Sequence, residues 1–322
     1  MKRNLPKILS SICDIKSGKI RETAVFPSFI ANTALSLSLI FLLSISSAHA
    51  EWVEYINDAS VGFTYNDNLN QSSFPSDEET DSYITPAYTF GRFYQANDLT
   101  RLRFSLDLTA DIHDEFNKLD SLDLIGNATV IHKFGIGPKK PWMRGNISLG
   151  RKDAELDIRD SKLQGVGLGA GKRFTERLSG QIGLNYNHRD GGAGQVIVEG
   201  KSSEVFDIEN KSISMNVDYL LDQRSQISAS LTHRDGEFDS ACTTGNVGIV
   251  LDVEDVKAIT GDEVFGGCVY RLDGSSNSAR VQYSYALGRH SSLNVSYEKR
   301  EGKADVLEYD TSLWNISLMY SQ

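Results

Sequence analysis

Three arginines recur in one local setting and are well suited to bind an anion. They stand in His188-Arg189-Asp190-Gly191, His233-Arg234-Asp235-Gly236 and Lys299-Arg300-Glu301-Gly302. A guanidinium group makes charge-assisted, often bidentate, hydrogen bonds to carboxylates and phosphates. We therefore take these three arginines as candidate ligands of an anionic sugar or phosphate, provided that the fold brings them together. The alternative is that each arginine pairs with its neighbouring acid or meets a phosphate at a membrane surface.

Catalytic, metal and cofactor chemistry is less well represented. His113, His188 and His233 could form an Asp/His set only if separate strands brought them to one rim. No His or Cys spacing typical of a metal site is present, and the acidic run 77–81 is expected to be a solvated loop. The glycines of 165–171 alternate as in a strand, so they are expected to give room in a wall. We predict no catalytic residue, no metal and no cofactor.

The element that positions these residues is the β-strand. In 102–113 apolar Leu102, Phe104, Leu106 and Leu108 alternate with polar residues. This period of two predicts a strand with one apolar and one polar face. The next question is which solvent the apolar face meets.

The beginning of the chain indicates an exported protein. Residues 1–50 hold a basic stretch, an apolar run over 29–45 and the ending Ala48-His49-Ala50, which together predict a secretory signal peptide cleaved before Glu51. An N-terminal membrane anchor is the alternative. Residues 51–322 then form one domain with 27 basic and 41 acidic residues, a net charge of −14 that disfavours nucleic-acid binding. Cys242 and Cys268 are expected to form a disulfide in an oxidising compartment, worth roughly 3 kcal/mol by chain entropy.

The same alternation recurs along the whole mature chain. Twelve strands are predicted, over residues 60–66, 83–90, 102–113, 122–133, 142–150, 165–172, 178–187, 212–220, 226–232, 278–287, 293–298 and 313–320. Short connectors follow the even strands, and mostly longer polar loops follow the odd ones. Together these features predict an all-β fold, a single antiparallel transmembrane β-barrel of the outer membrane with short periplasmic turns and long outer loops. A secreted β-sandwich is the alternative.

The strand count has an alternative of fourteen. The longest loop, 234–277, contains apolar alternation around Val247 to Leu251 and around Val269 to Leu272. Residues 252–260 could instead form a short helix folded into the barrel mouth.

If the apolar face meets lipid, the polar face lines the lumen. Its members are mostly small and hydrogen-bonding, with scattered charges that include the candidate ligands Arg103, Arg144 and Arg280. Such a lining favours water and hydroxylated solutes and suits a fatty-acid channel poorly. The alternation also places Arg189, Arg234 and Arg300 inward at the outer mouth. A lumen closed by paired charges and an infolded loop is the alternative.

Two short motifs carry a resemblance to a known group of proteins. Val61-Gly-Phe-Thr-Tyr-Asn-Asp-Asn68, followed by Ile84-Thr-Pro86, and Arg289-His-Ser-Ser-Leu-Asn-Val-Ser-Tyr297 resemble outer-membrane β-barrel porins, including members associated with exopolysaccharide loci. The resemblance implies a barrel that aids polysaccharide export and has no catalytic residues. Barrels of this kind usually end on an aromatic residue, whereas this chain ends Tyr320-Ser321-Gln322.

These observations lead to one preferred hypothesis and two alternatives. We expect an outer-membrane barrel that is a passive channel for small hydrophilic or saccharide solutes. The alternatives are a non-conducting barrel that supports exopolysaccharide export or surface attachment, and a surface hydrolase. The expected partners are outer-membrane lipid and lipopolysaccharide, the barrel-assembly machinery and an anionic oligosaccharide or polysaccharide, but not nucleic acid.

Overall fold

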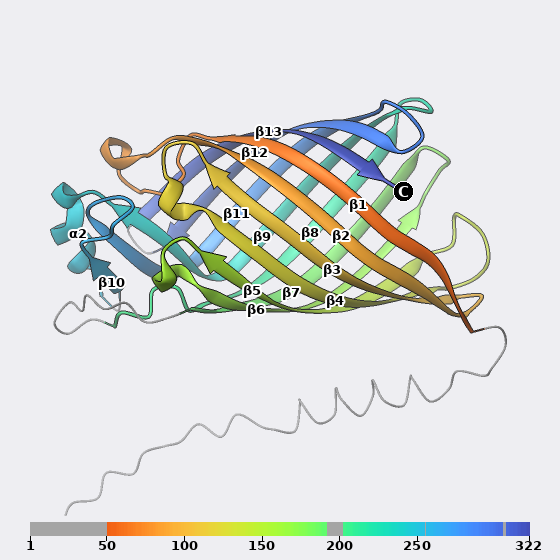
Figure 1. Ribbon diagram of the computed structural model, residues 1–322, viewed down its shortest axis with the longest axis horizontal. Coiled ribbons are helices and arrows are strands. Elements are labelled where there is room, and N and C mark those ends of the chain that lie inside the picture. The colour runs from red at the N-terminus through yellow and green to blue at the C-terminus, as the bar shows by residue number, and fades with distance from the viewer. Residues whose placement is uncertain (1–49, 192–201, 255, 305–306) are drawn as a thin grey trace, which may run out of the picture. The chain divides into compact units, whose positions relative to one another are not determined.

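The protein is a closed β-barrel, seen in a computed structural model that describes residues 50–191, 202–254, 256–304 and 307–322 (Figure 1). Among these residues, twelve strands form the wall: β1 (Glu51–Asn66), β2 (Asp81–Asn97), β3 (Thr100–His113), β4 (Ser121–Lys133), β5 (Trp142–Ala154), β6 (Ser161–Arg173), β7 (Leu178–Gly191), β8 (Ile208–Leu220), β9 (Ser225–Cys242), β11 (Cys268–Ala286), β12 (Ser291–Ala304) and β13 (Leu307–Ser321). All neighbouring wall strands are antiparallel, and β13 pairs with β1 to close the ring. The closed antiparallel barrel predicted from the alternation is confirmed.

The wall strands coincide with the twelve predicted strands, but many are longer. β9 and β11 extend past the predicted ends and remain paired up to Cys242 opposite Cys268. Residues 299–312, predicted as a loop, belong mostly to the β12–β13 hairpin, in which Lys299 lies opposite Ser312. These extensions are polar and lack the alternation that predicts a strand, because a strand beyond the lipid no longer needs one apolar face.

The alternative count of fourteen wall strands is wrong. Val247–Leu251 forms the short helix α2, and Val269 to Leu272 belong to the outer end of β11. The helix expected over 252–260 is also wrong, because Lys257–Thr260 forms β10, which pairs with the outer end of β11. Four short 3-10 helices, η1 (Pro75–Asp77), η2 (Asn117–Leu119), η3 (Asp157–Arg159) and η4 (Thr244–Asn246), lie in the outer connections of the described chain.

The outer surface of the barrel is an apolar belt. Alternate side chains such as Phe63, Leu106, Leu168 and Val281 are about half exposed, although they are large and apolar. An exposed belt of this size is stable only against lipid, and a closed barrel leaves no unpaired strand edge in the hydrocarbon. Tyr320 belongs to the belt near the end of β13, so the chain places an aromatic residue there even though it does not end on one.

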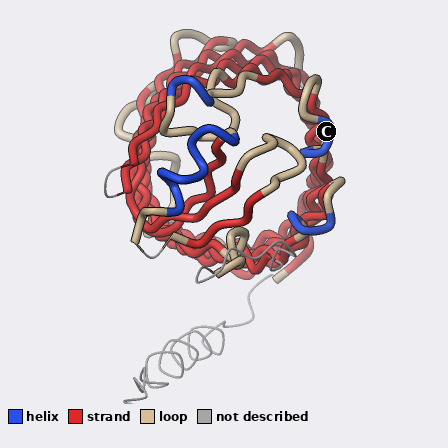
Figure 2. The backbone as a smooth tube through the Cα atoms, turned by 90° about the vertical axis from the view of Figure 1, so that its left-hand side faces the viewer, coloured by secondary structure: helices blue, strands red, loops and turns tan. Residues whose placement is uncertain are grey.

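The buried apolar core lies mainly at one end of the barrel and not in its wall. The connection between β9 and β11, residues 243–267, carries η4, α2 and β10; we call this segment the cap. Seen along the barrel from its outer end, helical turns and strand segments lie inside the outline of the ring (Figure 2). The apolar clusters of this region fix the cap over the outer mouth.

The predicted signal peptide lies almost wholly outside the described residues and remains a prediction, as does the cleavage point. No helix among the described residues has the length and the apolar character of a membrane span.

Candidate channel lumen and outer-mouth cap

The inward side chains form a polar lining that is hydrogen-bonded across neighbouring strands. The Asn127 amide donates to Asp107 at 2.6 Å, and the Ser228 hydroxyl donates to Asp218 at 2.8 Å. Arg280 donates to Gln282 and Ser296, each at 3.0 Å. These contacts satisfy the lining groups along the wall and hold them in fixed positions. The lining consists of the polar residues expected from the alternation.

A column of glycines opens space on the inner wall. Gly165, Gly167, Gly169 and Gly171 face inward on β6, and a Cβ atom at Gly167 would lie 2.4 Å from Asn146 Oδ1 and 2.7 Å from Asn185 Oδ1. The side chains of the two flanking strands therefore lie across β6 instead of projecting into the lumen. These glycines give room in the wall, in keeping with their alternation in the sequence.

Inward charges of both signs are spread around the wall. Asp107, Asp111 and Asp123 are on β3 and β4. Arg234 and Arg280 are on β9 and β11, six positions away around the twelve-strand ring. Each wall also carries the opposite charge, because Arg103 lies on β3 with Asp107 and Glu298 lies opposite Arg280. A polar solute in the lumen therefore meets charges of both signs on either side.

The predicted lumen arginines have no carboxylate partner. Arg103, Arg144 and Arg280 make no ion pair with a described residue. The Nε atom of Arg103 is buried and has no hydrogen-bond partner, and the guanidinium group of Arg144 lies 5.8 Å from the Trp142 ring centre. Their positive charges are thus available to an anion in the lumen.

The three arginines of the repeat are brought to the outer mouth, but acids neutralise two of them. Arg189 lies 3.5 Å from Asp239, and Arg300 lies 2.9 Å from Glu298. Arg234 makes no ion pair with a described residue, although Asp239 and Glu298 are near enough to act on its charge. The arrangement is a mixed cluster and not an open ring of cations. The partner acids are not the neighbouring Asp190, Asp235 or Glu301 that the sequence suggests.

The glycine of each repeat explains why the motif recurs. A Cβ atom would lie 2.5 Å from the Phe206 carbonyl oxygen at Gly191, 2.4 Å from the Glu209 carbonyl oxygen at Gly236, and 2.0 Å from the Tyr309 ring at Gly302. Gly236 also has a φ of +126°, a backbone conformation that favours glycine. Each glycine therefore permits close approach of another segment where the wall meets the outer loops.

In the described chain, the cap packs against four other outer connections, those between β1 and β2, β3 and β4, β5 and β6, and β7 and β8. Phe238, Tyr270 and Tyr309 belong to one apolar cluster around the disulfide, and Phe206 and Val269 belong to a second. Phe116 of the β3–β4 connection lies 5.3 Å from Phe265 of the cap, centre to centre. These four connections and the cap therefore form one packed layer. This layer lies outside the predictions from sequence, although apolar residues spaced through 247–259 between two cysteines are its signal.

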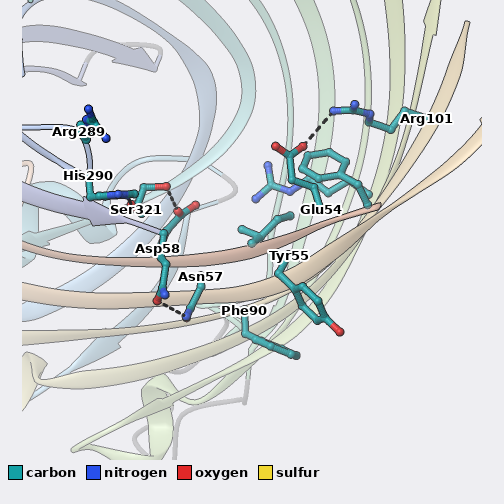
Figure 3. Close-up of a pocket in the computed structure, with 13 residues that line it drawn as sticks. Glu54, Tyr55, Asn57, Asp58, Phe90, Arg101, Arg289, His290 and Ser321 are labelled. Atoms are coloured by element: carbon teal, nitrogen blue, oxygen red, sulfur yellow. Dashed lines mark hydrogen bonds and ion pairs between the residues drawn. The ribbon is translucent and has the colours of Figure 1, made fainter. Parts of the chain in front are cut away.

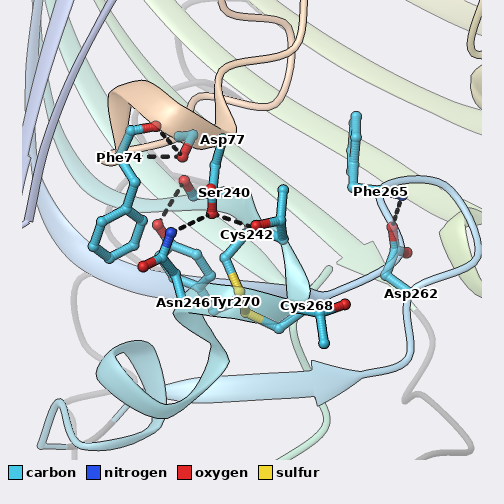
Figure 4. The surroundings of a disulfide bond; sticks show 12 residues. Phe74, Asp77, Ser240, Cys242, Asn246, Asp262, Phe265, Cys268 and Tyr270 are labelled. Atoms are coloured by element: carbon cyan, nitrogen blue, oxygen red, sulfur yellow. Dashed lines mark hydrogen bonds between the residues drawn. A yellow bond between two sulfur atoms is a disulfide. The ribbon is translucent and has the colours of Figure 1, made fainter.

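Buried polar contacts hold the cap in register. The Asp77 carboxylate accepts hydrogen bonds from the Thr243 amide at 2.9 Å and the Asn246 amide group at 2.8 Å (Figure 4). Arg159 forms a buried ion pair with Asp262 at 3.0 Å. Cys242 and Cys268, expected to pair, form a disulfide at the base of the cap. The expectation that the acidic run 77–81 is a solvated loop is wrong for Asp77 and Asp81, which are each only 3% exposed because the cap and the outer loops cover them. Arg159 and Asp262 have no distinguishing pattern in the sequence.

Burial and hydrogen bonding act in opposite directions on Asp77. Burial alone would raise the pKa of its carboxyl group. Hydrogen bonds from Asn246, Thr243 and Ser76 outweigh burial and hold the pKa below its ordinary value. The ionised form therefore stabilises the cap.

The histidines considered for hydrolysis form pairs without a nucleophile. His113 Nδ1 lies 2.8 Å from Asp81, His188 Nε2 lies 2.8 Å from Asp207, and His233 Nδ1 bonds Asn277. Within the described chain, none of these three rings has a serine, threonine or cysteine at hydrogen-bond distance. The described residues also contain no group of three His, Cys, Asp or Glu side chains placed to hold a metal.

The periplasmic mouth holds a wide cavity of about 900 Å³ (Figure 3). Arg101, Arg103 and Arg289 line it together with Glu54 and Asp58, and the Arg101–Glu54 ion pair spans 3.4 Å. The inner mouth thus has a polar and charged entrance.

Comparisons with known proteins identify the fold. No protein-family model matches this chain, and no curated protein is similar to it in sequence. A solved outer-membrane channel from Pseudomonas putida F1 is similar, with a TM-score of 0.56 at 10% identity over 87% of this chain and 98% of that one. The channel DcaP of Acinetobacter baumannii (TM-score 0.40, 8% identity, 86% and 99% covered) and the KdgM porin (TM-score 0.42, 12% identity, 82% and 99% covered) resemble it less closely.

The class of protein follows from the fold and the surface together. The likeness to the Pseudomonas channel shows the outer-membrane β-barrel fold, and the apolar belt requires lipid around it. The chain is an outer-membrane β-barrel protein, as its alternation predicted.

Proposed function

We propose that this protein is a porin-like passive channel for small hydrophilic solutes, saccharides among them. The observation that carries the proposal is the inner wall, which is polar and has a column of glycines where side chains would otherwise project. Polar walls replace the water hydrogen bonds that a hydroxylated solute loses on entry. Fatty acids would find no apolar path along such a wall.

The cap is the selective element in this proposal. It lies inside the outline of the outer mouth, and its two apolar clusters hold it there. A solute must pass beside it, near Arg234 and Arg300. We expect the cap to limit solute size. Arg234, which makes no ion pair with a described residue, is expected to favour anionic sugars.

The packed cap also supports a second candidate function. If it closes the mouth permanently, the barrel does not conduct and instead supports polysaccharide export or surface attachment. Two buried apolar clusters and the buried Arg159–Asp262 ion pair favour a cap that does not leave its place. Lipopolysaccharide, the assembly machinery and an acidic polysaccharide remain the proposed partners under both functions.

Liposome swelling distinguishes the two candidates. Refolded protein is placed in liposomes, and swelling is followed in arabinose, maltose and maltotriose. The channel predicts rates that fall with solute size, and the closed barrel predicts the rate of protein-free liposomes.

A matched pair of glycine variants tests whether solutes use the lumen. A Cβ atom at Gly167 would lie within 2.7 Å of Asn146 and Asn185, so Gly167→Phe is expected to push these side chains into the lumen. A Cβ atom at Gly145, on the lipid face, meets nothing closer than 3.6 Å, so Gly145→Phe is the control. We expect swelling to fall only in Gly167→Phe, with folding of both variants checked by heat-modified gel mobility. Equal swelling of the two folded variants would contradict a path through the lumen.

A further inference from the structure

The periplasmic rim carries a group of cations that lack counterions. Lys133, Lys139, Lys140, Lys172 and Arg173 surround the β4–β5 and β6–β7 turns, and none makes an ion pair with a described residue. The outer end of the barrel differs. All its described lysines except Lys211 have a carboxylate partner; they are Lys118, Lys152, Lys162, Lys257, Lys299 and Lys303.

These cations border a pocket that opens at the inner mouth of the lumen. The pocket has a volume of about 410 Å³, and Lys133, Lys140, Lys172 and Arg173 line it together with Trp142. The cations come from β4, β6 and the β4–β5 turn, and Trp142 comes from β5 between the two strands. Lys133 lies opposite Trp142, and Trp142 lies opposite Gly171. The fold therefore concentrates charges that are far apart in the sequence.

The one acid that lines this pocket, Asp218, already accepts hydrogen bonds from neighbouring side chains. Asp218 accepts hydrogen bonds from Ser228 at 2.8 Å, Gln226 at 3.3 Å and Ser179 at 3.4 Å. These donors stabilise the carboxylate where it is. The four lining cations keep a net positive charge that a bound anion can neutralise.

Trp142 supplies an apolar surface within the same pocket. A Cβ atom at Gly171 would lie 2.4 Å from the Trp142 ring, so the ring rests against the backbone of β6. Because Gly171 has no side chain, the Trp142 ring can lie against the wall beside the cations. An aromatic surface next to cations suits a solute with an apolar body and acidic groups.

We propose that this pocket, the inner-mouth anion pocket, binds the phosphate or carboxylate group of an anionic solute at the periplasmic end of the lumen. That the anion is a solute passing through the lumen depends on the channel function proposed above. Binding of an anion in the pocket does not depend on it. A phospholipid headgroup of the inner leaflet carries the same chemistry and is the other source to be tested. Because the cations are exposed, binding weakens as salt screens them.

Trp142 provides a readout that does not depend on conduction. The chain has three tryptophans, so the double variant Trp52→Phe with Trp314→Phe leaves Trp142 as the only tryptophan whose fluorescence is followed. This protein, refolded in neutral detergent, is titrated with trigalacturonate, with neutral maltotriose and with short-chain phosphatidylglycerol. We expect trigalacturonate to shift Trp142 emission to saturation, with half-saturation at least tenfold higher in 0.5 M salt, and maltotriose to have no comparable effect.

Matched charge variants locate the binding. Lys133→Gln, Lys140→Gln, Lys172→Gln and Arg173→Gln are combined in one variant, and Lys118→Gln, Lys162→Gln, Lys299→Gln and Lys303→Gln in its control. We expect half-saturation to rise at least tenfold in the first and less than twofold in the control.

Each outcome decides one part of the proposal. An equal response to maltotriose, or an equal effect of the control variant, overturns the pocket. A response to phosphatidylglycerol alone overturns the soluble source and assigns the pocket to lipid. Saturable trigalacturonate binding by a folded protein that fails to swell liposomes supports the pocket and overturns the channel function.

Discussion

Removing the Asp77 carboxylate should release the cap from the β1–β2 loop. Asp77 is 3% exposed and accepts hydrogen bonds from two groups of the cap, the Thr243 amide and the Asn246 side chain. In Asp77→Ala both donors lose their acceptor. A fully buried unsatisfied donor costs about 1–3 kcal/mol, and because these two donors are partly buried we take about 1.5 kcal/mol for each. We expect the free energy of cap opening to fall by about 3 kcal/mol, an increase of about 150-fold in the open population.

Hydrogen exchange measures this opening directly, because amides in a locally unfolding segment exchange through the open state. In the refolded protein, exchange over residues 243–253 should accelerate about 150-fold, while the wall strands keep their protection. The matched control is Asp222→Ala, which removes a carboxylate that also accepts two backbone amides but lies in a periplasmic turn. Unchanged exchange over 243–253 in a folded Asp77→Ala protein would refute the assigned anchor.

The same contact predicts how the cap responds to acid. Hydrogen bonds hold the pKa of Asp77 below its ordinary value of 3.8. A carboxyl group with a lowered pKa stabilises the folded state fully above its ordinary pKa and loses that contribution as pH falls through the lowered value. Protection of the cap by this carboxylate should therefore stay constant from neutral pH to about pH 4 and decrease below it. Asp77→Asn should lack this step.

Three further perturbations follow from the geometry. Reduction of the Cys242–Cys268 disulfide, or Cys242→Ser with Cys268→Ser, should destabilise the cap region by up to about 3 kcal/mol by chain entropy. Hydrogen exchange near residues 238–243 should then be faster. Unchanged exchange would show that the cap does not need the disulfide. Gly302→Ala should cost about 1–3 kcal/mol by overpacking against Tyr309, and thermal unfolding at the wild-type temperature would contradict this. Arg280→Gln removes a lumen cation that makes no ion pair with a described residue and should shift the reversal potential in a KCl gradient towards cation preference. No shift would place Arg280 outside the ion path.

The wall could be predicted from sequence because lipid imposes a strict rule. Each membrane-spanning strand needs one apolar face, and the alternate apolar residues of the sequence, such as Phe104, Leu106 and Leu108, form that face. The β9–β11 extensions above the lipid follow no such rule, so their predicted ends were short. Register is also fixed by the alternation, because a slip of one residue would turn every apolar side chain inward.

The cap could not be predicted in the same way. Its stability comes from contacts between loops far apart in the chain, such as Phe116 with Phe265 and Asp77 with Thr243. The repeated arginine motif also shows that sequence spacing alone does not predict which acid an arginine pairs with. Arg300 pairs with Glu298 two residues away, and the feature common to the three repeats is a glycine that another segment approaches closely.

Single-channel recording in a planar bilayer tests the central claim that the polar lumen conducts. A conducting lumen predicts steady conductance steps from the refolded mature protein, larger steps in Asp77→Ala because the cap opens, and smaller steps in Gly167→Phe. A protein shown to be folded that gives no steps, with or without the Asp77 carboxylate, would contradict the channel and favour the barrel closed by its cap.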